Sequence, residues 1–127
     1  SDAVLHPVPD TYFERTAEEA IRSDVYAEIF LFECENEAAG YGLIAKTYSQ
    51  EAGGMVWWIE EVYVREAFRS KGIGREFFAY LDKVKGSAVT RMRLEVEEDN
   101  TRAVALYKKL GYKPLEYAQM IKDAPLK

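Results

Sequence analysis

A strong strand pattern that runs directly into a glycine-containing helix start constrains this chain more than any other feature. Residues 55–64 (MVWWIEEVYV) are rich in β-branched and aromatic side chains, which predicts a strand. After a short connection, residues 69–74 (RSKGIG) lead into a segment over residues 72–85 with apolar residues at helical spacing, which predicts a helix that Gly86 ends. A strand, a loop and a helix in this order predict a helix packed back on a sheet.

The rest of the chain adds further short elements. Helices are expected over residues 17–22 and from the N-cap Asn100 to Gly111. Strands are expected over residues 26–34, 40–48, 91–96, from 112 and over 117–121, with a turn at 36–37. This order predicts an α/β (α+β) fold with a central mixed sheet and helices on its faces.

Length and composition narrow the class of protein. A chain of 127 residues predicts one domain, residues 1–127, and a net charge of −5 disfavours nucleic acid and anionic membranes as partners. Cys34 and His6 are the single cysteine and histidine, so an intrachain disulfide is excluded, no metal site is expected, and His6 is read as a surface residue. No secretory signal or membrane span is visible, so a cytoplasmic protein is predicted. Exposed edge strands in a small sheet make a homodimer a reasonable expectation.

The loop at residues 69–74 has the properties of a phosphate site. Glycine lets the backbone approach an oxyanion, and the unpaired N–H groups and dipole of a helix start favour negative charge. Arg69, Lys71 and Arg75 add cations. The Walker pattern is missing, and Phe77 occupies the third glycine of the dinucleotide fingerprint. Glycines that serve only helix packing remain the alternative.

Two stretches together resemble the GNAT N-acetyltransferase superfamily. These are residues 58–74 (WIEEVYVREAFRSKGIG) and 94–112 (LEVEEDNTRAVALYKKLGY), in this order. The resemblance implies a sheet whose two middle strands splay apart to admit the pantetheine arm of acetyl-CoA. It further implies that residues 62–64 pair with pantetheine, that residues 69–74 hold the pyrophosphate, and that Asn100 and Tyr107 face the thioester. The implied cofactor-binding residues are Val62, Tyr63, Val64, Arg69, Ser70, Lys71, Gly72, Ile73, Gly74, Arg75, Asn100, Ala103 and Tyr107.

The family usually begins with a further strand and helix, which this chain is expected to lack. Because that helix often lines the acceptor pocket, the resemblance says less about the acceptor than about the cofactor.

Acetyl transfer to an amine requires a base for the ammonium and an acid for the leaving thiolate. Tyr107 is the candidate acid, since its pKa of about 10 is close to the thiol value of about 8.5; a core aromatic is the alternative. Glu60 and Glu61 are the candidate bases, because carboxylates are unexpected within an apolar strand. Glu60 is preferred, as Val62 and Val64 would share its face in a regular strand. A bulge, a salt-bridging pair or a water chain are alternatives.

The sequence therefore predicts an acetyl-CoA-dependent N-acetyltransferase acting by direct attack in a ternary complex. Its acceptor would be a primary amine of a small molecule, an amino acid or a peptide. A catalytically silent acyl-CoA-binding sensor module is the alternative. The acidic residues at 95 and 97–99 are interpreted as a solvated loop, or else as an attractive surface for a cationic acceptor.

Overall fold

The computed structural model describes residues 10–125, which fall into two compact units divided between Glu95 and Val96. The described elements of the first unit are α1 (Asp10–Arg22), β1 (Ala27–Cys34), β2 (Glu37–Ser49), β3 (Gly54–Val64), the 3-10 turn η1 (Glu66–Phe68), α2 (Ile73–Val84) and β4 (Val89–Leu94). The second unit carries α3 (Thr101–Lys109). His6 lies outside the described residues.

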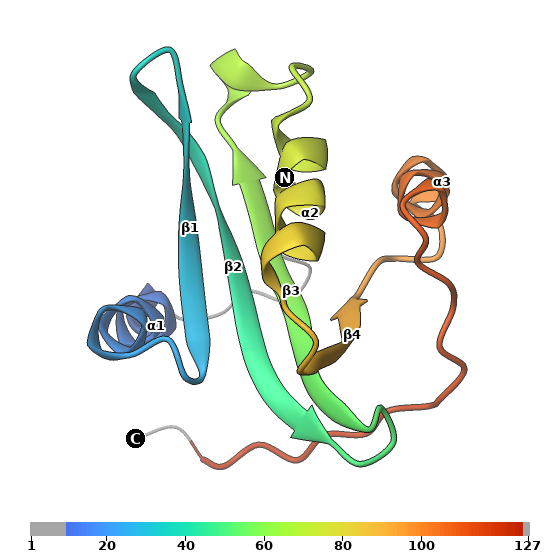
Figure 1. Cartoon of the computed structure of the whole chain (residues 1–127). Coiled ribbons are helices and arrows are strands. Elements are labelled where there is room, and N and C mark those ends of the chain that lie inside the picture. The colour runs from blue at the N-terminus through green and yellow to red at the C-terminus, as the bar shows by residue number, and fades with distance from the viewer. Residues whose placement is uncertain (1–9, 126–127) are drawn as a thin grey trace. The chain divides into compact units, whose positions relative to one another are not determined.

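The four strands form one sheet in the order β1-β2-β3-β4 (Figure 1). The first three strands are antiparallel, whereas β4 runs parallel to β3 because α2 carries the chain back along the sheet. The sheet is therefore mixed and mostly antiparallel, as the sequence predicts.

A two-residue turn joins β1 to β2. Glu35 and Asn36 both have positive φ values, 53° and 66°, and Cys34 pairs with Glu37 across the turn. Such turns match the right-handed twist of the strands, and asparagine tolerates this conformation. The turn lies one residue earlier than predicted, so β2 begins at Glu37.

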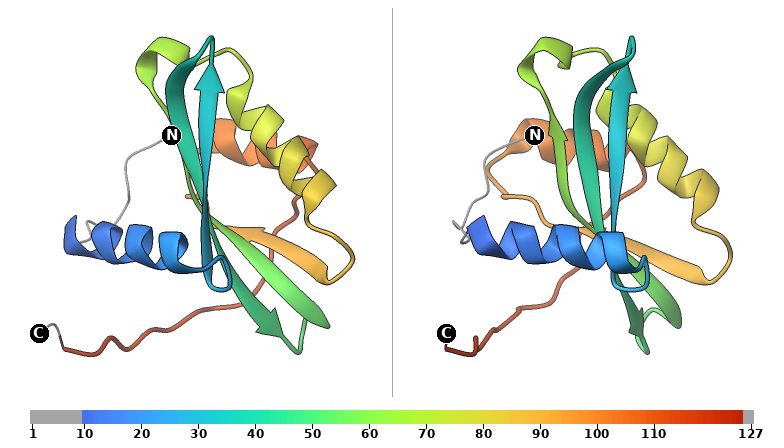
Figure 2. Two further views of the ribbon diagram at one scale, coloured as in Figure 1. Left: turned by 60° about the vertical axis from the view of Figure 1, so that its left-hand side comes forward. Right: turned by 90° about the vertical axis from the view of Figure 1, so that its left-hand side faces the viewer.

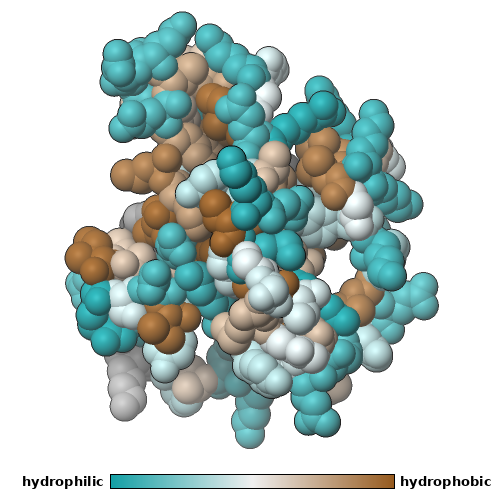
Figure 3. All heavy atoms as spheres, viewed as in Figure 1, coloured by the Kyte–Doolittle hydropathy of each residue, from teal (hydrophilic) through white to brown (hydrophobic). Residues whose placement is uncertain are grey.

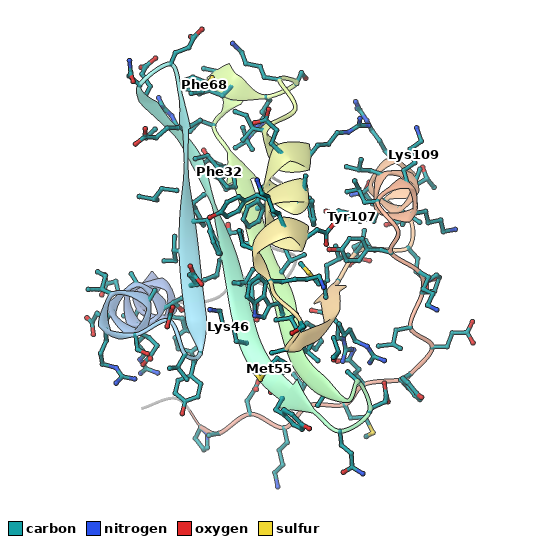
Figure 4. All side chains as sticks on the ribbon, viewed as in Figure 1. Phe32, Lys46, Met55, Phe68, Tyr107 and Lys109 are labelled. Carbon is teal, nitrogen blue, oxygen red and sulfur yellow. The ribbon has the colours of Figure 1, made fainter. Side chains whose placement is uncertain are left out.

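A cluster of aromatic rings packs α2 against one face of the sheet. The ring of Phe77 lies 5.5 Å from that of Phe30 and 5.0 Å from that of Phe32, both on β1. Phe32 is labelled in Figure 4. Gly42 of β2 makes room for this ring, because a Cβ there would overlap Phe77. Leu81, one helical turn further on, is fully buried.

The opposite face of the sheet carries α1, which packs against β1. Both views of Figure 2 show α1 and α2 on opposite sides of the sheet, which confirms the prediction of helices on both faces. In Figure 3, hydrophilic side chains cover much of the face that carries α2, with apolar ones scattered among them. Within residues 10–125, no helix is long and apolar enough to cross a bilayer.

The second unit contains one helix with both predicted ends. The Ala103 N–H donates to Asn100 Oδ1 at 3.2 Å, which caps α3, and Gly111 follows the helix with a φ of 97°. The strands predicted from residue 112 and over 117–121 are wrong. Described residues 112–125 form no strand and are mostly exposed. The Tyr117 N–H donates at 3.1 Å to the carbonyl of Leu115, which is a local contact and not a hydrogen bond between strands.

Candidate active site

A β-bulge sits at Glu60, in the middle of β3. Ile44 pairs with Ile59 and Leu43 pairs with Glu61, so Glu60 is the extra residue that faces no partner position on β2. Beyond the bulge, side chains of β3 again alternate between the two faces of the sheet. Val62 lies on the face that carries α2, because it pairs with Gly42, which lies under Phe77. The expectation that Glu60 shares a face with Val62 and Val64 assumed a regular strand, and the bulge removes the alternation on which it rested.

The bulge coincides with the place where β3 and β4 part. Their parallel pairing ends at Ile59 and Leu94, whereas β3 remains paired with β2 as far as Val64 (Figure 1). The two residues that follow the last pair are Glu60 and Glu95. The first unit therefore provides a strand segment, residues 60–64, that β4 does not cover.

Glu60 has an altered acidity at this parting point. Glu60 is exposed by its surface area, but neighbouring protein atoms still displace part of the water around its carboxylate, and the negative charge of Glu95 adds to this effect. Both causes disfavour the ionised form and raise the pKa of Glu60. A carboxylate with a raised pKa is a better proton acceptor than an ordinary one.

Glu61 lies in a different environment, on the face of the sheet opposite α2. Its carboxylate accepts a hydrogen bond from Tyr41, and the ring of Tyr41 lies 5.8 Å from that of Tyr63. Desolvation and then this hydrogen bond to Glu61 raise the pKa of Tyr41 to about 12. The bulge thus gives the two adjacent glutamates separate surroundings.

The glycine loop before α2 is open to a ligand. Ser70 and Gly72 have φ values of 65° and 80°, and Gly72 is the N-cap of α2. A Cβ on Gly72 or Gly74 would meet nothing within 4 Å. The glycines are therefore not required by packing against the described residues, and they leave space where helix N–H groups favour an anion.

The cations of this loop are partly committed to the fold. Arg69 Nε donates to the carbonyl of Val64 at 2.8 Å, which ties the loop to the end of β3. Lys71 Nζ lies 6.0 Å from the centre of the Phe68 ring, and Arg75 is exposed. Ile73 packs against the buried cluster of Ala39, Val64 and Phe68, so only its backbone is available to a ligand. Figure 4 shows Phe68 at that end of the sheet.

The second unit carries the other predicted residues. Tyr107 projects from α3, is half-buried, and its ring lies 6.1 Å from that of Tyr112 in an edge-to-face arrangement (Figure 4). Asn100 uses its Oδ1 to cap α3 with the N–H of Ala103. Asn100, Ala103 and Tyr107 therefore all belong to the second unit.

Comparison with known proteins decides the family. The model of the acetyltransferase (GNAT) family matches residues 2–112. The chain belongs to the GNAT acetyltransferase family.

Similar proteins agree with this assignment. The thialysine N-ε-acetyltransferase of Bos taurus is 30% identical over 119 residues, which span 83% of this chain and 69% of that protein. A possible acetyltransferase from Clostridium difficile 630 has the same fold, with a TM-score of 0.80 at 21% identity over 93% of this chain and 79% of the other. The structure of AAC(6')-Iy with a CoA-containing bisubstrate analogue gives a TM-score of 0.74 at 18% identity, covering 92% and 82% of the two chains.

Three features of the GNAT site could not be read from the sequence. The position of the bulge and the hydrogen bond between the Tyr41 and Glu61 side chains depend on strand register. The hydrogen bond from Arg69 to the Val64 carbonyl depends on how the loop folds back onto the end of β3. The unusual pair of glutamates in an apolar strand was the one visible signal of the bulge.

Proposed function

We propose that this GNAT protein transfers the acetyl group of acetyl-CoA to a primary amine of a small molecule, an amino acid or a peptide. The reaction would be a direct attack within a ternary complex. The observation that carries the proposal is the parting of β3 from β4 beside Glu60, a carboxylate with a raised pKa. The open glycine loop belongs to the same unit and supplies the anion site.

The residues present fit acetyl-CoA. The space above Gly72 and Gly74 suits a diphosphate, with N–H groups from residues 69–74 as donors and Lys71 and Arg75 as cations. The segment from Val62 to Val64 is not covered by β4, which suits an extended pantetheine arm. Because Arg69 already binds the Val64 carbonyl, we assign that carbonyl to the fold and the rest of the segment to the ligand.

Bound acetyl-CoA supplies a thioester whose carbonyl carbon is the electrophile. Glu60 accepts a proton from the acceptor ammonium, which frees the nitrogen lone pair. The new bond joins this nitrogen to the carbonyl carbon, the carbon–sulfur bond breaks, and Tyr107 donates its proton to the departing sulfur. The second proton of the attacking nitrogen then passes to the Tyr107 phenolate, which leaves a neutral amide and a free thiol. An alkylammonium has a pKa of about 10, so a base with a raised pKa contributes directly to the rate.

The relatives support an amine acceptor. The names of similar proteins refer to thialysine and aminoglycoside acetylation, and the AAC(6')-Iy structures hold CoA or a CoA-containing analogue. These proteins act on different small amines, so we assign the acceptor only as far as the amine.

A matched pair of glycine variants tests the cofactor site. Gly72 and Gly53 both have left-handed φ values, 80° and 70°, and open space around them, but Gly53 lies in the turn between β2 and β3. Alanine at either position imposes about 1–2 kcal/mol of backbone strain. We expect Gly72→Ala to weaken CoA binding in calorimetric titration and Gly53→Ala to leave it unchanged. Equal affinities in both variants and the parent would contradict the assignment.

The acid is tested by Tyr107→Phe. We expect kcat to fall by about 10²–10⁴ while CoA affinity is retained, because the phenol acts on the leaving sulfur and not on binding. Release of free thiol from acetyl-CoA with a panel of amines measures this. A parent protein that binds CoA but acetylates no amine would be a sensor module instead.

A further inference from the structure

The connection from β3 to the glycine loop begins at Arg65. The backbone N–H of Arg65 donates to the carbonyl of Ala39 at 2.7 Å, and its Nη1 atom donates to the carbonyl of Ala38 at 2.5 Å. Both carbonyls lie near the start of β2, so one residue binds two successive positions of the β1–β2 hairpin. Figure 1 shows this hairpin and the connection at the same end of the sheet.

The side chain of Arg65 also contacts the connection itself, through Phe68 of η1. The Cζ atom of Arg65 lies 5.4 Å from the centre of the Phe68 ring, and Lys71 Nζ lies 6.0 Å from the same centre. Phe68 is buried against Ala39 and Val64, so packing holds the ring in place. A guanidinium over an aromatic ring is attracted by it. Arg65 therefore joins β2 to η1, the element that leads into the glycine loop.

The shape of the glycine loop needs support from outside the loop. Ser70 has a φ of 65°, a left-handed conformation that is unfavourable for a residue with a Cβ. Such a conformation persists only where the surrounding structure imposes it. Arg69 supports the loop by donating to the Val64 carbonyl at 2.8 Å, and Arg65 supports the residues before it. Donors that are already oriented bind a ligand more tightly, because less entropy is lost on binding.

We propose that Arg65 is a positioning residue for acetyl-CoA, which acts through Phe68 and the glycine loop and not by contact with the cofactor. Its guanidinium is already engaged by the Ala38 carbonyl and the Phe68 ring. Arg65 thereby holds the N–H groups of residues 69–74 in the arrangement that receives the diphosphate. This inference rests on the proposed binding of acetyl-CoA and deepens it, because it makes the start of β2 part of the support of the cofactor site.

Substitution of Arg65 measures this role by steady-state kinetics and by calorimetric titration with CoA. We expect Arg65→Gln to raise KM for acetyl-CoA and the dissociation constant of CoA by about three- to tenfold, the effect of one lost hydrogen bond. The value of kcat should change little, because Arg65 does not contact the reacting atoms. A partly unfolded preparation would instead lower kcat and leave KM unchanged. Arg65→Lys should retain part of the affinity, since its charge remains without the planar guanidinium.

A second substitution, at Ser70, separates positioning from direct contact with the cofactor. Glycine adopts a left-handed φ without steric cost, so Ser70→Gly lowers the need for support from Arg65. We expect Ser70→Gly, added to Arg65→Gln, to restore part of the lost CoA affinity. Loss of an arginine that bound a phosphate group directly would not be compensated in this way. Equal affinities in the single and double variants would therefore overturn the positioning role.

Arg91→Gln is the matched control. Arg91 also makes a side-chain hydrogen bond to another element, donating to Glu51 at 2.7 Å, but next to the turn between β2 and β3. We expect this variant to keep the CoA affinity of the parent protein, and a loss equal to that of Arg65→Gln would contradict a specific role for Arg65.

The outcomes distinguish this inference from the proposed function. A parent protein that acetylates amines, with the same KM for acetyl-CoA in Arg65→Gln, overturns the role of Arg65 and leaves acetyl transfer standing. A parent protein that binds CoA but acetylates no amine overturns acetyl transfer, whereas the calorimetric comparison still decides the role of Arg65. If the parent protein binds no CoA, both fall.

Discussion

Two neighbouring carboxylates in β3 differ in chemistry because one extra residue separates their surroundings. Glu60 is the extra residue of the bulge and is repelled by the negative charge of Glu95. Glu61 accepts a hydrogen bond from Tyr41. Desolvation and like charge raise the pKa of Glu60, which favours a role in proton transfer. A carboxylate that accepts a phenol hydrogen bond is suited to a fixed role in binding.

The raised pKa of Glu60 predicts a pH-dependent rate. We expect kcat to rise with pH through a pKa above the usual glutamate value of about 4.3, because Glu60 must be ionised to accept the proton. Glu60→Gln should lower kcat by about 10²–10⁴ and remove this limb of the profile. Glu61→Gln should mainly raise KM. An unchanged profile in Glu60→Gln would assign the base elsewhere, for example to water.

The same shift predicts a change in stability. A carboxyl whose pKa is higher in the folded state binds protons more strongly when folded, so its stabilising contribution is present below the unfolded pKa and is lost as pH rises through the folded pKa. We therefore expect Glu60→Gln to raise the melting temperature relative to the parent at pH 7 and to make little difference near pH 3. Thermal unfolding at both pH values measures this, and a gain confined to acid pH would contradict it.

Individual residues were predicted unevenly. Asn100 as a cap and the glutamates as unusual strand residues follow from local rules, and the structure confirms the cap. The face that each glutamate occupies does not follow, because a bulge shifts alternation and its position depends on the partner strand. The role of Tyr107 remains a prediction.

At the scale of elements, α2 depends on one close approach to β2. Gly42 lies directly under the Phe77 ring, so α2 sits close to the sheet just where the glycine loop begins the helix. Local propensity predicted this helix within a residue of its observed ends, since its apolar spacing is regular. Its distance from the sheet could not be predicted, because it requires knowing which residue faces the ring.

This close approach predicts the cost of a single methyl group. We expect Gly42→Ala to lower the free energy of unfolding by about 1–3 kcal/mol, because the added carbon overlaps Phe77 and the packing must shift. Gly74→Ala is the control, since its Cβ meets no described atom and should leave stability unchanged or slightly higher. Chemical denaturation measures both, and an equal effect at the two positions would argue against the packing explanation.

The whole molecule is predicted best where sequence patterns are strong. The four strands, α2 and α3 were predicted within a few residues, whereas α1 begins at Asp10 instead of residue 17 and η1 was not predicted. The mixed sheet follows from the strand–loop–helix pattern of β3 and α2. The two C-terminal strands were wrong because alternating apolar residues there find no ladder in the described structure, and Pro114 removes a donor. The homodimer and the single domain over residues 1–127 stay predictions.

Ligand linkage provides a test at this scale. CoA at a hundredfold excess over its dissociation constant should add about 2.7 kcal/mol to the free energy of unfolding, because it binds the folded state alone. If the two units fold as one domain, the calorimetric and van't Hoff enthalpies of this transition should agree. Two separate transitions, with CoA shifting only one of them, would show that the units are independent domains.

The bulge has an evolutionary consequence. Because Glu60 is the surplus residue, loss of its codon would let Ile59 and Glu61 pair with Ile44 and Leu43 in ordinary succession, and every later side chain of β3 would keep its face. A single deletion could thus remove the proposed base and leave the side-chain alternation of β3 and the glycine loop unchanged. Related proteins that have lost acetyl transfer in this way would be recognised by a β3 that is one residue shorter.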